Sequence, residues 1–521
     1  MREISDEPKK IIVVILAVIL VVSLIPVFIV ARYDCASGDD YNYGAWAHQA
    51  IVSGAGLLKV LAEAGRTTSG TWNSWQGTWF DCFIFCLHPE VFSDSAYVLV
   101  PYIFVIMQIV VYLGFAHHFL KVRWKLGNYY WAIVGLLFLI FTFQLVPSQK
   151  SGMFWWVGCV HYVMPMCMAL WGTVHGDRFL MWHKKSDLIL LSVISALIGG
   201  ATYPAALLLP IAVGLLWLSD FVFNKESGKD EKNLLLIIPF LLDNIGLVIS
   251  AIAPGNAVRS ASDLSHGANP SGGAIATIFK SITFSVKDAL DMFIGQKTFV
   301  VILFIVTCII TLIVFDGAGG EKELKAVFAH PILFGGVMFL INASMYAPRL
   351  YAGGVVSSGY YNFNFWTFCL CNLAGIIYVC GYLFFVKEIY IGTKNLKIVG
   401  IAALLICLVV AFVGRHGVKE YTDYVCLEYY LNGHADDYKA QIALQRILME
   451  EEGVDDVVVP EINNEQGPLM QMPIVADSEN IDNKMAAGFY GKNSCRAIPR
   501  DEWLELYGEK YGLSEILFKK K

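Results

Sequence analysis

Residues 11–31 read IIVVILAVILVVSLIPVFIVA, and they are followed at once by Arg32-Tyr-Asp-Cys-Ala-Ser-Gly-Asp-Asp-Tyr-Asn-Tyr-Gly44. The apolar run is long enough to cross a bilayer, which takes about 20 helical residues. No small-residue cleavage site follows it, so we interpret the run as a membrane anchor and not as a removed signal peptide. The adjacent acids Asp39 and Asp40 are then expected at the membrane surface. Carboxylates held at that boundary can act as a general base or bind a cation.

The composition of the whole chain is that of an integral membrane protein. Of its 521 residues, 56% are hydrophobic and 16% are charged, whereas soluble domains carry about 25% charged residues. The net charge of −6 is small, so no nucleic-acid partner is expected. Five cysteines are expected outside the membrane, and their spacing selects no disulfide pairing. These are Cys35, Cys82, Cys86, Cys426 and Cys495.

Ten further apolar segments predict an all-α polytopic protein with about eleven transmembrane helices. The segments 187–200 and 205–222 are separated by only four residues, Ala201-Thr-Tyr-Pro204, which leaves room for no more than a tight turn between two spans. The complete set is 11–31, 96–116, 129–146, 157–175, 187–200, 205–222, 234–252, 298–315, 329–346, 364–386 and 398–414.

The basic residues predict the orientation of the chain. Six short connecting segments on one side hold 17 Lys and Arg in 68 residues, and the opposite segments hold 9 in 140 residues. Because the basic side of a membrane protein is cytoplasmic, we expect a cytoplasmic N-terminus and an extracytoplasmic C-terminus. A plasma-membrane location in a bacterium is the corresponding expectation.

Two parts are predicted along the chain. Residues 1–414 form the transmembrane bundle, with long outer segments at 32–95 and 253–297, and residues 415–521 form a small extracytoplasmic α/β module. Within this module a strand is expected at 457–461. No nucleotide-binding motif lies on the cytoplasmic side, so the polar machinery is expected to face outward.

The first outer segment carries the strongest candidates for chemistry. Two adjacent carboxylates repel each other, which raises the pKa of one of them unless a cation neutralises the pair. Asp40 or Asp39 could therefore act as a general base, or both could bind a divalent cation such as Mg²⁺ or Mn²⁺. Tyr41 and Tyr43 follow directly. An amphipathic helix is predicted at 45–64.

Aromatic and basic residues extend this candidate site. Three tryptophans are expected on one side of a short helix or turn, either as an interfacial anchor or as a platform for a sugar or polyprenyl chain. Arg259 and Arg349, at the outer ends of two spans, have the geometry to bind a phosphate. Residues 265–273, which follow Arg259, predict a flexible loop that could close over a lipid-linked substrate. The substrate-binding candidates are Arg259, Arg349, Tyr41, Tyr43, Trp72, Trp75, Trp79, His161 and Tyr203.

The arrangement resembles the GT-C superfamily of integral membrane glycosyltransferases. Gly38-Asp-Asp-Tyr-Asn-Tyr-Gly44, Ala253-Pro-Gly-Asn-Ala-Val-Arg259 and Ala486-Ala-Gly-Phe-Tyr-Gly-Lys492 are similar to segments of a bacterial multi-pass family of unassigned function that is close to the GtrII-like glucosyltransferases. The resemblance implies a GT-C-like fold, a polyprenyl-phosphate-linked sugar as donor and a cell-surface glycan as acceptor. It also implies that Asp40 or Asp39 activates the acceptor, with Asp40 slightly favoured.

Two other functions remain open at this point. A transporter or flippase of a lipid-linked glycan would have internal repeats and broken helices at the membrane midplane. The sequence has no clear repeat, and Asp243 is its only deep acid. A membrane O-acyltransferase would need intramembrane histidines, for which His161 alone is little support.

Overall fold

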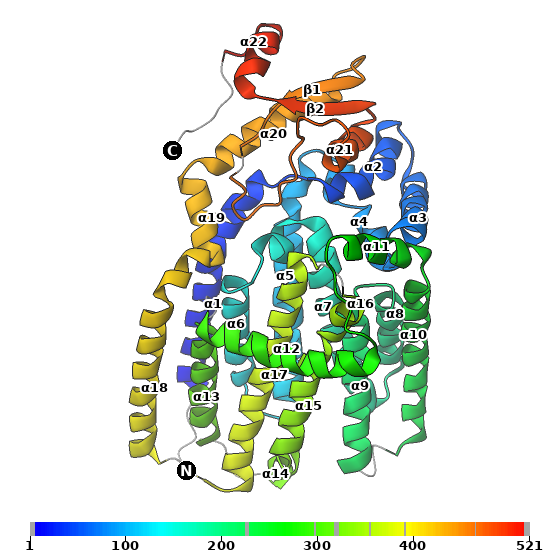
Figure 1. The fold of residues 1–521 in the computed structure, drawn as a ribbon. Helices are drawn as coiled ribbons and strands as arrows, with labels where there is room; N and C mark the ends of the chain where they lie inside the picture. Colours follow the sequence, from blue (N-terminus) through cyan, green and yellow to red (C-terminus); the bar gives the residue numbers. More distant parts are fainter. Residues whose placement is uncertain are drawn as a thin grey trace.

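The computed structural model describes residues 6–223, 229–295, 298–316, 322–353, 356–389, 392–463 and 465–514. Within these residues the chain is almost entirely helical, with one small sheet. Figure 1 shows a bundle of long helices with the N-terminus at one end and the C-terminal helices and strands packed over the other end. The prediction of a helical, membrane-embedded protein is confirmed at this level.

Seven helical segments among the described residues are long and apolar enough to cross a membrane. Some of them are continued by a short 3₁₀ or π turn. They contain α1 (Asp6–Val30), α5 (Val100–Ala116), α7 (Trp156–Trp182), α9 (Tyr203–Phe223), α10 (Ile237–Ala251), α17 (Ser358–Gly381) and α18 (Thr393–Gly414).

The structure does not support the predicted eleven crossings. Four predicted spans are helices of only 14 to 17 residues, and a 14-residue helix is about 21 Å long, less than the roughly 30 Å hydrocarbon core. The predicted segments 129–146 and 329–346 extend two residues or fewer beyond the helix ends on each side, and segment 187–200 is itself only 14 residues long. The four helices are α6 (Tyr130–Gln144), α8 (Lys185–Ile198), α13 (Val300–Asp316) and α15 (Pro331–Ser344).

Helix α7 is the centre of the bundle. It packs against α5, α8, α9 and α17, and most of its residues are buried. A Cβ atom added to Gly172 or Gly176 would come within 2.7 Å of Leu209 or Val213 of α9, so the small residues let the two helices approach closely. Helix α18, by contrast, buries none of its apolar residues in the bundle, as expected for a helix that faces lipid.

The two long outer segments are mostly helical. The first contains α2 (Asp39–Val52), α3 (Leu57–Ser74) and α4 (Trp79–Phe85), and the second contains α11 (Pro254–Ser265) and α12 (Ala274–Ile294). The single helix predicted for 45–64 is therefore wrong, because the chain turns at Gly54, whose φ is +75°. The predicted flexible loop at 265–273 is a short connection between α11 and α12. The remaining short helices are α14 (Lys322–Val327) and α16 (Ala347–Ala352).

The residues after 414 contain the only sheet in the described part of the chain. Strands β1 and β2 pair in parallel, with Asp456 opposite Ser494, and α21 connects them. The expected strand at 457–461 is confirmed, whereas β2 was missed. The elements are α19 (Thr422–Leu431), α20 (His434–Glu450), β1 (Asp456–Pro460), α21 (Ile481–Tyr490), β2 (Ser494–Ile498) and α22 (Arg500–Tyr511). All twelve cysteines of the chain lie in the described residues and are free thiols.

Candidate functional site

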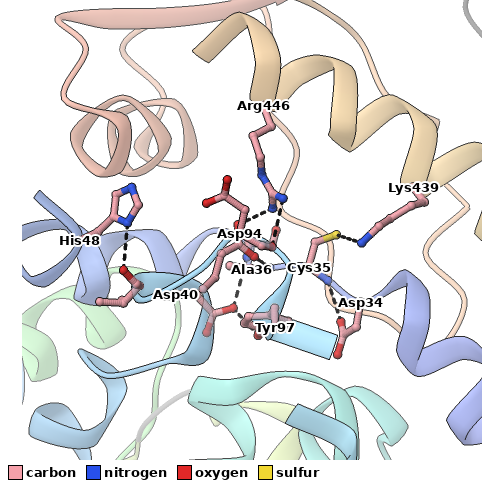
Figure 2. Close-up of polar contacts among 12 residues, drawn as sticks. Asp34, Cys35, Ala36, Asp40, His48, Asp94, Tyr97, Lys439 and Arg446 are labelled. Carbon is pink, nitrogen blue, oxygen red and sulfur yellow. Dashed lines mark hydrogen bonds and ion pairs between the residues drawn. The ribbon is translucent and has the colours of Figure 1, made fainter. Parts of the chain in front are cut away.

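Asp40 is buried at the amino end of helix α7. Its Oδ2 accepts hydrogen bonds from the Tyr97 hydroxyl at 2.6 Å and from the Ser37 backbone N–H at 3.2 Å. Its Oδ1 accepts the Val157 backbone N–H at 3.3 Å, and the Tyr97 oxygen accepts the Trp156 N–H at 3.0 Å. The first N–H groups of a helix have no partner within the helix, so Asp40 and Tyr97 together cap α7. Figure 2 shows the contact between the Asp40 and Tyr97 side chains.

This environment favours the neutral form of the Asp40 carboxyl. Burial raises its pKa to about 8, the Tyr97 hydrogen bond opposes that rise, and the charge of Asp39 adds to it. The sequence argument attributed a raised pKa to repulsion between the two acids. Removal from water is instead the largest cause, because Asp40 has no exposed surface.

Asp39 is in a different environment although it is the next residue. It is the first residue of α2 and remains half-buried. The pKa of Asp39 is raised to about 6. Burial is the largest cause, the Asp482 carboxylate adds to the rise, and the Arg259 guanidinium opposes it. Successive helical side chains do not face each other, so one acid points into the bundle and the other is within electrostatic reach of Arg259 and Asp482.

Arg259 of α11 is the central cation of this site. Its Nη1 donates to the Gln76 side-chain oxygen, and the guanidinium lies 5.7 Å from the centre of the Trp75 ring. The first contact fixes the arginine on the segment between α3 and α4. Trp75 itself is 40% exposed, so the pair lies at an accessible surface.

Four of the predicted site residues, all on other elements, are close enough to Arg259 for electrostatic interaction. They come from α2, α7 and α9, which are far apart in the sequence. Counting Trp75, the tertiary structure therefore brings five of the predicted residues around the Arg259 guanidinium. The four are Asp39, Tyr43, His161 and Tyr203.

His161 is held by a buried acid. Its Nδ1 lies 2.6 Å from Oδ2 of Asp81 in α4, and Asp81 has no exposed surface. Burial raises the pKa of Asp81 well above its usual range, against a hydrogen bond from the Thr202 backbone. The contact uses Nδ1 and leaves Nε2 of the partly exposed imidazole for a further partner.

The other aromatic candidates lie elsewhere. The indole N–H groups of Trp72 and Trp79 donate to the backbone carbonyls of Ile249 and Gly246 in α10, at 3.0 and 3.3 Å. These two rings therefore attach the first outer segment to α10. The ring of Tyr41 packs against α21, with its centre 4.8 Å from that of Phe489.

Arg349 is also placed away from the acid pair. The guanidinium lies 5.8 and 5.5 Å from the ring centres of Tyr360 and Tyr361 at the start of α17. These cation–π contacts, together with the nearby Asp288 carboxylate, account for its position.

The predicted Mg²⁺ or Mn²⁺ site does not fit the acid pair. The Asp40 carboxylate accepts three hydrogen bonds and is turned toward α7, so Asp39 and Asp40 do not converge on one point. Among the described residues there is also no group of three or more His, Cys, Asp or Glu side chains that could hold a metal ion.

Several residues of this neighbourhood were missed or undervalued by the sequence argument. Tyr97 lies at the start of a predicted span, where tyrosines are common. Gln76 lies between Trp75 and Trp79, and no pattern distinguished it from its neighbours. Asp482 lies just before the segment 486–492, whose resemblance was noted, and this was the one signal that could have pointed to it.

Fold and site together define a helical membrane protein with an acid–arginine site under its C-terminal module. No protein-family model matches the chain, and no curated protein matches it significantly.

Proposed function

We propose that this protein is a membrane glycosyltransferase of the GT-C type, which transfers a hexose from a polyprenyl phosphate to a cell-surface glycan. In this proposal the end of the bundle covered by the C-terminal module is extracytoplasmic, as the Lys and Arg distribution predicts. The observation that carries the proposal is the half-buried Asp39 carboxyl at the start of α2, whose pKa of about 6 is set by burial and by the charges of Asp482 and Arg259.

The proposed reaction is a single displacement with inversion. The Asp39 carboxylate accepts the proton of the acceptor hydroxyl, and the acceptor oxygen forms a bond to the anomeric carbon. The bond between that carbon and the phosphate oxygen breaks, and its electron pair leaves with the polyprenyl phosphate. A base with a pKa just below neutrality is mostly ionised at pH 7 and still basic enough to accept a proton.

Arg259 has the chemistry to bind the departing phosphate. Its planar guanidinium can donate two parallel hydrogen bonds to phosphate oxygens, and Gln76 and Trp75 hold it in place. His161 is oriented by Asp81 and is a second candidate donor at the same phosphate. We assign the base role to Asp39 and not to Asp40, because the Asp40 oxygens are occupied by the cap of α7.

Contacts at the other end of the bundle favour an enzyme over a transporter. Arg123 pairs with Asp220 and lies 3.6 Å from Asp177, which in turn is 2.7 Å from His118. These contacts tie together the ends of α5, α7 and α9 that are far from the C-terminal module. Alternating access requires such ends to separate, and separation would leave buried charges without partners.

The test is sugar transfer in liposomes, with labelled polyprenyl-phosphate sugars as donors and crude cell-surface glycan as acceptor. Wild type should transfer sugar, and Asp39→Asn should reduce kcat by about 10²- to 10⁴-fold while donor binding persists. Asp40→Asn, matched for folded protein, is the control and should lose less activity. Movement of the labelled lipid across the bilayer without transfer would instead identify a flippase.

A further inference from the structure

The C-terminal module contacts the short segment that precedes the acid pair. Figure 2 shows Arg446 and Lys439 of α20 reaching toward residues 34–36, which lead from α1 to Asp39 and Asp40. The two cations are seven residues apart and so lie on one face of the helix. More than 400 residues of chain separate them from the segment that they contact.

The best-defined contact runs from Arg446 through Glu90 to Ala36. Arg446 Nη2 donates to Glu90 Oε1 at 2.6 Å, and its Nη1 donates to the Asp94 backbone carbonyl at 3.1 Å. The other oxygen of Glu90 accepts the Ala36 backbone N–H at 2.9 Å. Glu90 is 1% exposed, so Arg446 is the cation that holds this carboxylate, and the carboxylate in turn holds the backbone three residues before Asp39.

A second contact reaches the two residues directly before the acids. The Met472 backbone N–H donates to the Ser37 hydroxyl at 2.7 Å, and the Ser37 N–H donates to Asp40. Gly38 has φ of +53°, and a Cβ atom there would lie 1.8 Å from Met472 Sδ. The module thus lies against the backbone from Ala36 to Gly38 on one side, while α7 fixes Asp40 on the other.

The charges make this contact difficult to replace. Asp34 and Glu90 are both nearly inaccessible to water, and Lys439 Nζ lies 3.6 Å from Cys35 Sγ, beside Asp34. Removing one partner of a buried ion pair leaves an uncompensated charge. Loss of the Arg446 cation would therefore loosen the segment, since Glu90 at that depth would take up a proton and accept a weaker hydrogen bond from Ala36.

We propose that Arg446 is a positioning residue, which acts through Glu90 and Ala36 to orient Asp39 toward Arg259. This inference rests on the proposed function, because it concerns the orientation of the proposed base. It makes the C-terminal module part of the catalytic unit and gives it a role beyond capping the bundle or recognising the acceptor.

The test compares Arg446→Met with Arg496→Met, an exposed arginine on β2 of the same module. Hydrogen exchange of peptides that cover residues 32–44 is measured in detergent-solubilised protein, and the kinetics and pH profile of transfer are measured on the same preparations. Arg446→Met should exchange faster in 32–44 and lose roughly 10- to 100-fold in kcat. The low-pH limb of its profile should also move, which mere loss of folded protein would not cause.

Arg446→Lys keeps the charge but not the two-point contact, so it should recover part of both effects. Arg496→Met should behave as wild type. Unchanged exchange in 32–44, or faster exchange with unchanged kcat and pH profile, would overturn the proposal. If wild type transfers no sugar, the proposed function fails, and faster exchange in Arg446→Met would then support only the contact between the module and the segment.

Discussion

The Tyr97 hydroxyl donates a 2.6 Å hydrogen bond to Asp40, and the same oxygen accepts the first N–H of α7. This relationship separates two acids that are neighbours in the chain. Asp40 becomes part of the cap of the central helix, and Asp39 is left as the carboxyl that interacts with the charge of Arg259.

The buried Asp40 should make stability depend on pH. Its folded pKa of about 8 lies above its usual value of 3.8, so the neutral acid contributes stability that is fully present below pH 4. This contribution is lost as the pH rises through 8, by up to about 1.4 kcal/mol per unit. Asp40→Asn does not titrate, so thermal unfolding should show the gap between wild type and variant narrowing from pH 5 to pH 8. A difference in stability between wild type and Asp40→Asn that stays constant from pH 5 to pH 8 would contradict this prediction.

The rate of transfer should follow the ionisation of Asp39. The base must be deprotonated, so activity should rise with pH through about 6 and level off above it. Asp482→Asn removes a neighbouring negative charge and should move the midpoint to lower pH. The matched control is Asp501→Asn at the start of α22, whose profile should stay in place. If the pH–rate profile of Asp482→Asn has the same midpoint as that of wild type, Asp39 is not the base.

The two candidate arginines should differ in their effect on the donor. Arg259→Gln should raise the KM for the polyprenyl-phosphate sugar by about tenfold or more, since a charge-assisted hydrogen bond contributes about 1.5–3 kcal/mol. Arg349→Gln, which loses contacts with Tyr360 and Tyr361, should change it less. Steady-state kinetics at saturating acceptor distinguish them, and equal effects would place the phosphate between the two arginines.

Replacement of a glycine by alanine should have opposite effects on stability in the neighbouring helices α2 and α3. A Cβ atom on Gly44 of α2 would lie 2.2 Å from Nε2 of the buried His88, whereas one on Gly70 of α3 would meet nothing within 4 Å. Gly44→Ala should destabilise the protein by about 1–3 kcal/mol through overpacking. Gly70→Ala should stabilise it by roughly 0.5–1 kcal/mol, because alanine is the better helix former. Thermal unfolding of both variants checks the pair.

The apolar pattern predicted the class of fold and the position of most helices. It failed to give the number of crossings at α6, α8, α13 and α15, because an apolar segment shows that its residues avoid water and not that its helix is long enough to span a bilayer. The pattern also missed the break near Gly54, where a positive φ ends α2. Helix α18 is more apolar in sequence than helix α7, although only α7 is buried by other helices.

The sequence by itself determined that this is a helical membrane protein with acids and an arginine at the ends of its spans. The physical reason is that burial of apolar side chains in a bilayer is a local property of each segment. Only the tertiary structure decided which acid faces the site. Asp39 and Asp40 have the same chemistry and adjacent positions, and their difference comes from Tyr97, Val157, Arg259 and Asp482, which lie 57 to 443 residues away in the chain. Contacts over such distances depend on how the helices pack, and no local pattern records them.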